Sequence, residues 1–408
     1  MDASAIFILT LEALFALWLL WRSGALSSRP ALVISVLLLA LAFAVRGLCL
    51  DYVTLDYVNF LSYWVQHFRD AGIVQGLARP VGNYNIPYLY FLALFSLSDI
   101  NDLYLIKLLS IFFDVLLAYA AMGLASKMGV GVRARLACFF GVLLLPTVVL
   151  NGALWGQCDS VYVSLALMSV YLALDGKPSA SVLCMTLAFG FKLQAVFIMP
   201  VMAVLWFCGK YKLRHFLLFP AGYVALVLPA VLCGRPFMDT LTLYFDQAGS
   251  VGSALNYNSP SMYSLYNYIQ DEKQAAALGV AAAFTFMALV LYICFVMRRR
   301  LSPASITAAC LLLALGIPLL LPHMHDRYFF AVDVLTVAIA CYSYAYSPAP
   351  LLSQFASGLG YHAYLKMRYF LPMSYGCGAL LVVLALAFVM FFRSLDGRSA
   401  KTPESEAG

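Results

Sequence analysis

Apolar segments separated by short polar connections extend along almost the whole chain. Most of them approach the roughly 20 residues that a helix needs to cross a hydrocarbon core about 30 Å thick. The pattern therefore predicts an all-α polytopic membrane protein with about twelve or thirteen transmembrane helices. The predicted spans are Ala5–Leu20, Ala31–Leu48, Leu103–Ala125, Leu136–Val149, Val161–Leu174, Ser179–Phe191, Ala195–Cys208, Phe216–Cys233, Ala275–Met297, Ala304–Leu321, Tyr328–Tyr344 and Met373–Phe392, with Leu351–Tyr364 as a weaker thirteenth.

Composition excludes a soluble protein. Hydrophobic residues make up 64% of the 408 positions and charged residues 11%, whereas a soluble domain carries about 25% charged residues. We predict a single integral membrane domain over residues 1–392 and a short polar tail over residues 393–408. Because no basic segment precedes the first apolar segment, we expect that segment to be a span and not a cleaved signal peptide.

Lysine and arginine mark alternate connections between the predicted spans. By the positive-inside rule these connections face the cytoplasm, and the N-terminus lies outside. The net charge of +6 therefore calls for no nucleic-acid partner. Lys366 and Arg368 depart from the pattern. The positive residues that follow it are Arg22, Arg29, Lys127, Arg133, Arg135, Lys177, Lys210, Lys212, Arg214, Arg298, Arg299, Arg300, Arg393, Arg398 and Lys401.

The same alternation places the intervening connections together on the outer side. The first, residues 49–102, has about 54 residues, too many for a simple connector. It contains the amphipathic segment Trp64–Asp70 and the apolar segment Ile86–Leu97, so we expect interfacial helices there. The Tyr, Asn, Ser and Gly content of residues 235–274 fits either a cover over a cavity or an ordinary belt of interfacial tyrosines. The other outer connections are residues 151–160, 192–194 and 323–327.

Two acids, Asp51 and Asp56, stand where the first outer connection begins. A carboxylate at this depth reaches both water and the head-group plane, where a general base would deprotonate an acceptor hydroxyl. Asp56 is better placed because it precedes the aromatic segment Tyr57–Trp64. The alternative interpretation is that both acids are solvated loop residues.

The next two outer connections carry polar groups suited to a sugar phosphate. Trp155 offers an aromatic face for sugar stacking, and Gln157 and Asp159 add polar groups, although the segment also fits a tight helical hairpin capped by Asp159. Lys192 and Gln194 interrupt two short apolar segments. A lysine at this depth needs an anion such as a lipid phosphate, or else it extends its ammonium group to the interface.

The densest polar cluster is His323, His325, Asp326 and Arg327. Charge is costly at the edge of a bilayer, so such a cluster is a functional-site hypothesis. Arg327 offers a planar fork that suits phosphate, and a histidine can donate, shuttle a proton or bind a metal. A structural interfacial cluster is the alternative. No other His or Cys cluster completes a metal site, so we predict no metal, and a divalent cation remains possible but unsupported.

Charges also lie inside the predicted spans. Lys107 and Asp114 are seven residues apart and share one helix face. We expect Asp114 to pair with a polar group on another helix and to specify packing, and Asp333 to do the same. The ten cysteines read as small buried hydrophobes, with a disulfide among Cys49, Cys158 and Cys233 left open.

At these residues the chain resembles the multi-span glycosyltransferases of the GT-C superfamily, and within it bacterial proteins similar to the second mannosyltransferase of GPI-anchor assembly. The resemblance covers roughly residues 45–345, and its motifs occur in the family's order. They are Asp56-Tyr57, Phe60–Trp64, Asn83–Tyr90, Lys107, Phe113-Asp114, Trp155–Asp159, Phe191–Gln194 and Met324–Phe330.

The resemblance implies inverting transfer of a hexose, mannose or a similar sugar, from a polyprenyl-phosphate carrier to an unknown glycan, lipid or protein acceptor. It places the reaction on the non-cytoplasmic face, with a bacterial plasma membrane as the expected location. Asp56 is the expected base and Asp51 its rival. Asp326 stands where the family usually has Glu. The other implied site residues are Arg327, Lys192 and His325 for the donor phosphate, and Trp155, Gln157, Asp159, Gln194, Tyr84 and Asp326 for the substrates.

Two other classes of function remain open from the residues alone. A transporter or flippase of a polyprenyl-linked or anionic substrate would use Lys107, Asp114 and Lys192 along its path. Many transporters show two related halves with broken helices, and no such repeat is evident here. A non-catalytic scaffold would leave the clustering of outer polar groups unexplained.

Overall fold

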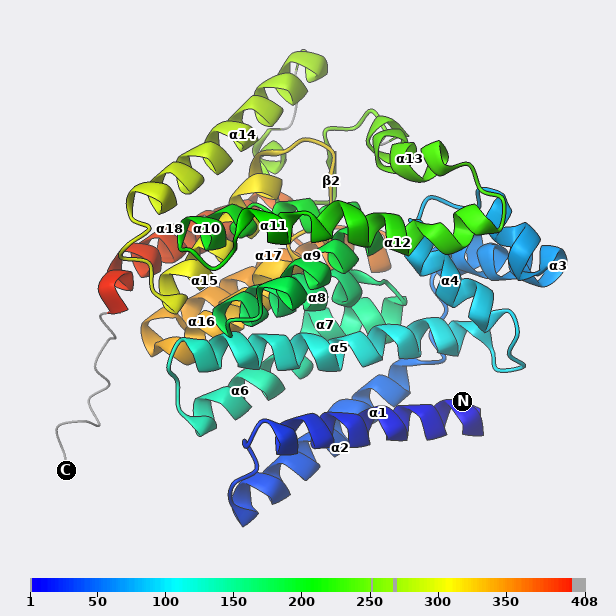
Figure 1. Ribbon diagram of the computed structural model, residues 1–408, viewed down its shortest axis with the longest axis horizontal. Coiled ribbons are helices and arrows are strands. Elements are labelled where there is room, and N and C mark those ends of the chain that lie inside the picture. The colour runs from blue at the N-terminus through cyan, green and yellow to red at the C-terminus, as the bar shows by residue number, and fades with distance from the viewer. Residues whose placement is uncertain (1, 251, 267–269, 398–408) are drawn as a thin grey trace.

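The structure, a computed structural model, describes residues 2–250, 252–266 and 270–397, without the side chains of residues 245–250. Two positive residues of the predicted tail, Arg398 and Lys401, lie outside the described residues. The described chain is almost entirely helical (Figure 1). The prediction of an all-α polytopic membrane protein is confirmed.

The elements follow one another as short and long helices with a single pair of two-residue strands. The α-helices are α1 (Ala3–Arg22), α2 (Arg29–Cys49), α3 (Ser62–Ala78), α4 (Ile86–Phe95), α5 (Asp102–Lys127), α6 (Val132–Leu143), α7 (Pro146–Val149), α8 (Asp159–Leu174), α9 (Pro178–Phe191), α10 (Val201–Phe207), α11 (Leu213–Phe216), α12 (Leu218–Leu232), α13 (Phe237–Ser250), α14 (Glu272–Val296), α15 (Pro303–Leu320), α16 (Phe330–Tyr342), α17 (Pro348–Leu365) and α18 (Met373–Arg393). The other elements are η1 (Tyr57–Leu61), η2 (Leu150–Trp155), η3 (Leu193–Phe197), η4 (Met262–Leu265), η5 (Tyr344–Tyr346), η6 (Leu395–Gly397), β1 (Asn256–Tyr257) and β2 (Met324–His325).

Among the described residues, seven helices are long and apolar enough to cross a membrane, or eight if one bent pair is a single span. The bent pair replaces the predicted span Leu136–Val149: α6 and the segment Pro146–Trp155 meet at 43°. The bend arises because Leu145, which precedes a proline, takes an extended conformation. The long helices are α1, α2, α5, α14, α15, α18 and the pair α11–α12.

The weaker thirteenth predicted span, Leu351–Tyr364, corresponds to α17, which has 18 residues but is not one of the seven helices. The remaining predicted spans are shorter helices. They are α8, α9, α16 and the joined elements η3 and α10, and α4 is a further short apolar helix in the first outer connection. Neighbouring helices shelter them, since α8 packs against the long helix α5 and against α9. In the centre of the bundle, 78% of the most apolar segment of α5 and 89% of that of α15 are buried. Only 17% of the corresponding segment of α14 is buried, so α14 faces outward. The helical hairpin of α1 and α2 lies along one side of α5 (Figure 1).

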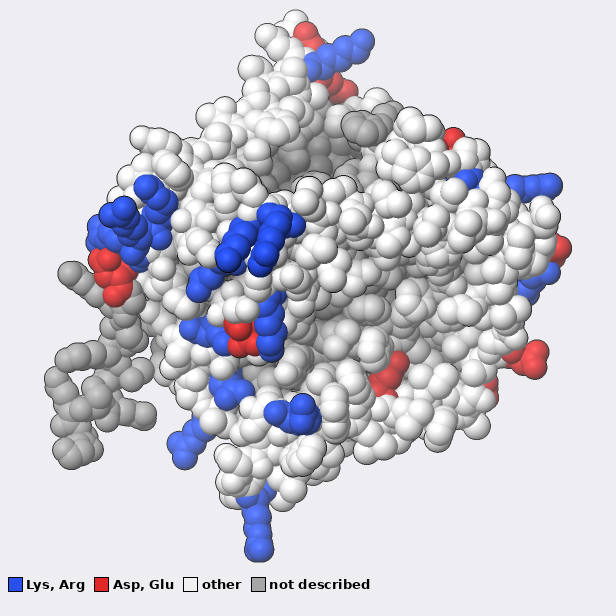
Figure 2. Space-filling model, viewed as in Figure 1, with Lys and Arg blue, Asp and Glu red and all other residues white. Residues whose placement is uncertain are grey.

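Most of the positive residues on the face shown in Figure 2 gather at one end of the bundle, and a few lie elsewhere. Contacts between loops far apart in sequence hold this end together. Lys127 pairs with Asp175, and the Arg135 guanidinium donates to the carbonyl of Ser23 at 3.0 Å. The grouping of alternate positive connections is therefore confirmed as a structural fact, while the side of the membrane they face stays a prediction.

Helix lengths place the opposite ends of the short helices below the surface of the molecule. At 1.5 Å per residue, α5 is about 39 Å long and α8 about 24 Å. Both helices end near the positive side, because Lys127 at the end of α5 pairs with Asp175 just past α8. Asp159, at the start of α8, therefore lies deeper in the molecule than Asp102 at the start of α5.

Asp114 has the partner that the sequence predicted, a polar group on another helix. The Arg46 guanidinium of α2 donates to its Oδ2 at 2.8 Å, with both side chains fully buried. Ser160 donates to the other carboxylate oxygen. The Lys107 ammonium instead binds the carbonyls at the end of α2, including that of Leu50 at 3.0 Å. Asp333 accepts hydrogen bonds from serines of α17, and these contacts confirm the packing interpretation.

All ten cysteines are free. The disulfide left open among Cys49, Cys158 and Cys233 is therefore absent. Burial of Cys138, Cys158, Cys294, Cys310 and Cys377 agrees with their interpretation as small hydrophobes.

Candidate active site

A cavity of about 490 Å³ lies near the start of α8, at the end of this helix opposite to the grouped positive residues. Segments from the first outer connection, the α9–η3 break and the α15–α16 connection meet around it. Its lining residues are Asp56, Phe60, Leu61, Trp64, Asn83, Tyr84, Asn85, Gln157, Phe191, Lys192, Leu193, Gln194, Gly252, Tyr257, His325, Arg327, Tyr328 and Tyr364. The outer polar clusters predicted from the sequence therefore converge on a single cavity.

Asp56 is held in this cavity by three hydrogen-bond donors. Its Oδ2 accepts from the indole N–H of Trp155 at 2.8 Å and from the side-chain amide of Gln157 at 2.5 Å. Its Oδ1 accepts from the hydroxyl of Tyr364 at 2.5 Å. A carboxylate has about four acceptor positions. One position on Asp56 therefore remains for a group in the cavity.

The turn that presents Trp155 and Gln157 depends on glycine. Gly156 has φ of +79°, a left-handed conformation that ends η2 at low cost only for a residue without Cβ. The backbone N–H of Gln157 then donates to the carbonyl of Asn151 at 2.9 Å, and Thr54 donates to the carbonyl of Trp155. The turn is therefore fixed both within itself and to the segment that carries Asp56.

Asp159 sits behind the cavity between two cations. Its Oδ1 accepts from the ammonium of Lys192 at 2.5 Å, and its Oδ2 lies 3.5 Å from Nε of Arg327. Asn151 donates to the same Oδ2 at 2.8 Å. Asp159 is 1% exposed, and a buried carboxylate is tolerated only when paired and hydrogen-bonded in this way. It therefore orients Lys192 and Arg327 toward the cavity wall.

Arg327 has further partners in the same region. Its NH1 donates to Asp326 at 3.3 Å, and its guanidinium lies 5.2 Å from the ring centre of Trp155. The Nε atom makes no hydrogen bond, because its contact with Asp159 is too long. Oε1 of Gln194 is also buried without a hydrogen bond among the described residues. Nε of Arg327 faces Asp159, whereas Gln194 lines the cavity, so its Oε1 is an acceptor beside the cavity without a partner among the described residues.

Burial sets the ionisation of the α15–α16 connection. It lowers the pKa of His325 to about 4, an effect that Arg327 and Lys192 strengthen. It raises the pKa of Asp326 to about 6, against the opposing effect of Arg327. At neutral pH His325 is therefore an uncharged imidazole that can donate or accept one hydrogen bond, and Asp326 is mostly ionised.

The second large outer connection covers one side of the cavity. Strand β1 pairs in parallel with β2, so that Tyr257 lies opposite His325, and their rings stack at 4.8 Å. The backbone N–H of His323 donates to the carbonyl of Leu255 at 2.8 Å. With Gly252 and Tyr257 in the cavity lining, these contacts favour the cover over the ordinary tyrosine belt.

The segment from residue 93 to residue 208 matches the family model described as "Alpha-(1->6)-mannopyranosyltransferase, N-terminal domain". Over this segment the chain is similar to that mannosyltransferase family. The match runs from the end of α4 to just past α10 and includes Trp155, Gln157, Asp159, Lys192 and Gln194. It supports the interpretation of the sequence as a glycosyltransferase that acts on mannose. No curated protein matches the chain significantly.

Most of the predicted site residues lie together, and that mannosyltransferase match covers about half of them. The predicted residues whose side chains line the cavity are Asp56, Tyr84, Gln157, Lys192, Gln194, His325 and Arg327. Trp155, Asp159 and Asp326 are buried directly behind them, each bonded to a lining residue or stacked on one. Asp51 is placed elsewhere: it is exposed, outside the cavity lining, and accepts from the hydroxyl of Tyr104 at 2.7 Å.

Tyr364 and Tyr257 were missed by the sequence analysis. Tyr364 binds Asp56 and stacks on Trp155 at 4.4 Å, although it lies on α17, the weakest predicted span. The aromatic pair of Tyr361 and Tyr364 on one helix face would have been the signal. The hydroxyl of Tyr361 accepts from the side-chain amide of Asn151 at 2.8 Å. The described residues include no group of three or more His, Cys, Asp or Glu that could hold a metal ion.

Proposed function

We propose that this protein transfers a mannosyl group from a polyprenyl-phosphate carrier to an acceptor hydroxyl, with inversion, in the cavity around Asp56. The bond between the acceptor oxygen and C1 of the sugar forms as the bond from C1 to the phosphate oxygen breaks. Asp56 takes the acceptor proton, and polyprenyl phosphate leaves. The observation that carries the proposal is the single cavity that joins a fixed carboxylate to two cations.

The environment of Asp56 suits a general base. Its three hydrogen bonds fix the carboxylate orientation, and the side chain is part of the cavity lining. A base needs to lie within hydrogen-bond reach of the proton that it removes. The remaining acceptor position on Asp56 is therefore where the acceptor hydroxyl binds.

Arg327 and Lys192 suit the phosphate of the donor. Both line the cavity and both are held by Asp159 from behind. Charge that develops on the departing phosphate is stabilised by such fixed cations, an effect often worth several kcal/mol. His325, uncharged at neutral pH, contributes a neutral N–H donor.

The depth of the cavity suits a lipid-linked donor. The cavity lies near the start of the short helix α8, deeper in the molecule than the start of α5, and Phe60 of its lining is 51% exposed. A polyprenyl chain in the bilayer can therefore reach the opening while its phosphate stays at the polar level. The positive end of the bundle lies away from the cavity, so the positive-inside rule supports a reaction on the outer face of the membrane.

Transfer of label tests the proposal. Membranes that contain the protein are incubated with polyprenyl-phosphate [¹⁴C]mannose, and the label recovered in water-soluble or protein-bound products is measured. We expect transfer that disappears in the Asp56→Asn variant. In sealed vesicles, movement of intact donor across the bilayer without transfer would instead identify a transporter and contradict the proposal.

A further inference from the structure

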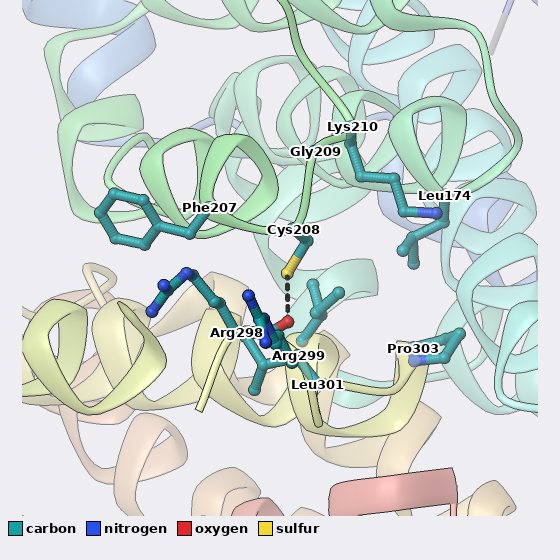
Figure 3. A pocket seen from close by; sticks show the side chains of 10 residues that line it. Leu174, Phe207, Cys208, Gly209, Lys210, Arg298, Arg299, Leu301 and Pro303 are labelled. Atoms are coloured by element: carbon teal, nitrogen blue, oxygen red, sulfur yellow. Dashed lines mark hydrogen bonds between the residues drawn. The ribbon is translucent and has the colours of Figure 1, made fainter. Parts of the chain in front are cut away.

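A second cavity, of about 590 Å³, lies at the positive end of the bundle (Figure 3). Helix α8 separates it from the candidate active site, because Asp159 begins this helix and Leu174 at its end lines the second cavity. The 16 residues of α8 span about 24 Å. The lining residues are Leu174, Phe207, Cys208, Gly209, Lys210, Arg298, Arg299, Leu301, Pro303 and Ile306.

Three cations dominate the polar lining of this cavity. Lys210 follows α10, and Arg298 and Arg299 follow α14 on the facing side (Figure 3). Within the described residues none of the three forms an ion pair, and no acid lines the cavity. Nearby Lys127 and Arg300, by contrast, pair with Asp175 and Asp396. The cavity therefore carries positive charge that the described protein leaves without a counterion.

An apolar surface lies beside the cavity and faces away from the helix bundle. Phe207 packs edge-on against Phe295 of α14 with ring centres 5.3 Å apart. Phe295 is 45% exposed, and the neighbouring Trp206 is 43% exposed. Helix α14 has little of its surface buried in the protein. In a membrane these side chains contact acyl chains, so the cations stand at the level of the head groups.

We propose that this cavity binds the head group of an anionic phospholipid, with its phosphate between Lys210, Arg298 and Arg299. One acyl chain lies along Phe295 and the outward surface of α14. Arginine forks suit phosphate oxygens, and basic pockets between membrane helices bind anionic head groups in this way. The apolar flank selects a lipid over a free anion, because a soluble phosphate leaves that surface uncovered.

Native mass spectrometry of the purified full chain tests the site. The protein is exchanged into detergent with phosphatidylglycerol or phosphatidylcholine, and the bound lipid is measured. We expect retention of phosphatidylglycerol over phosphatidylcholine. The triple variant Lys210→Gln, Arg298→Gln, Arg299→Gln should lower that retention about tenfold.

A matched triple variant controls for total charge. Arg22→Gln, Arg29→Gln and Arg133→Gln remove three exposed charges from the end of α1 and the starts of α2 and α6, at the same end of the bundle (Figure 1), and should retain the lipid. If the first variant is poorly folded by its melting temperature, Arg298→Lys with Arg299→Lys replaces it. That variant keeps the charge without the planar forks, so we expect its retention of phosphatidylglycerol to fall partway, and retention equal to that of the wild type would contradict the proposal.

Three results would overturn the inference. The first is equal retention of the two lipids by the wild-type protein. The second is equal loss in the two triple variants, which would show an effect of overall charge. The third is equally tight binding of glycerophosphoglycerol, the soluble head group, which would make the cavity a site for free phosphate esters.

Discussion

The indole N–H of Trp155 donates to Oδ2 of Asp56 at 2.8 Å, although 99 positions separate the two residues. The same indole stacks on Tyr364 and carries the guanidinium of Arg327 over its ring at 5.2 Å. One rigid side chain therefore fixes the position of the carboxylate relative to the cation. In the proposed reaction the carboxylate acts on the acceptor hydroxyl and the guanidinium acts on the departing phosphate, on opposite sides of C1 of the sugar.

Asp56→Asn should abolish transfer. The amide keeps the size of the side chain but cannot take the acceptor proton, and a general base contributes about a hundredfold or more to rate. Initial rates with the lipid-linked donor measure the effect. Asp51→Asn is the matched control and should retain activity, because Asp51 lies outside the cavity. Full activity of Asp56→Asn would place the base elsewhere.

Trp155→Phe should lower kcat about tenfold or more while donor KM changes little. The variant keeps an aromatic ring beside Tyr364 and Arg327 but loses the bond to Asp56, and hydrogen bonds to charged groups are worth about 1.5–3 kcal/mol. Steady-state kinetics separate kcat from KM. Trp206→Phe, at the far end of the bundle, serves as the control. An unchanged kcat would show that the indole N–H does not position the base.

Arg327→Ala should raise the KM for the lipid donor about tenfold or more. The change removes the phosphate fork and also leaves Asp159 and Asp326 with less neutralising charge. Titration of the donor at fixed acceptor measures the effect. Arg327→Lys keeps the charge without the fork, so its KM should lie between those of the wild type and the alanine variant. A normal KM in Arg327→Ala would assign the phosphate to other residues.

Donor affinity should depend on the ionisation of Asp326, whose pKa burial raises to about 6. Above pH 6 its carboxylate is charged and competes with phosphate for Arg327; below pH 6 it is neutral, and Arg327 is free to bind the donor. Donor KM should therefore fall about threefold or more from pH 7.5 to pH 5.5. In Asp326→Asn this pH dependence should be lost. A KM that rises on acidification in the wild type would contradict the assignment.

Arg46→Leu should destabilise the protein strongly, because it leaves the carboxylate of Asp114 buried without its cation. Removal of one partner from a buried ion pair costs about 3–5 kcal/mol. Thermal unfolding in detergent measures the change. The double variant Arg46→Leu with Asp114→Leu removes both charges and should recover much of the stability. Equal destabilisation of the single and double variants would show that packing volume, and not charge, decides.

The sequence predicted the long helices and the positive residues in alternate connections. A run of apolar residues of membrane length has few alternatives to a helix, because every backbone polar group must be satisfied within it. The ends of α1, α2, α5, α14, α15 and α18 therefore agree with the predicted spans within a few residues. The bend before Pro146 was not predicted, although the residue before a proline is a known place for a helix to end.

The candidate site was predicted in part. Charged and aromatic residues in outer connections are conspicuous in an apolar chain, so Asp56, Gln157, Lys192 and Arg327 could be found from their type and position. Tyr364 gives only the weak signal of its pairing with Tyr361 on one helix face, because a tyrosine near a helix end is ordinary in a membrane protein. Its partner Asp56 lies 308 positions away in the chain, and no local pattern contains that relationship.

By itself the sequence determined the membrane fold, the alternation of positive and polar connections, and the residue types available for chemistry. It could do so because the hydrophobic effect and the positive-inside rule act locally along the chain. Only the tertiary structure placed Asp56, and not Asp51, in the cavity lining, and only it showed that Asp159 holds Lys192 and Arg327 from behind. These outcomes depend on where helix ends meet in space. Helix lengths, the break before Lys192 and the turn at Gly156 set those positions together, and no single segment encodes them.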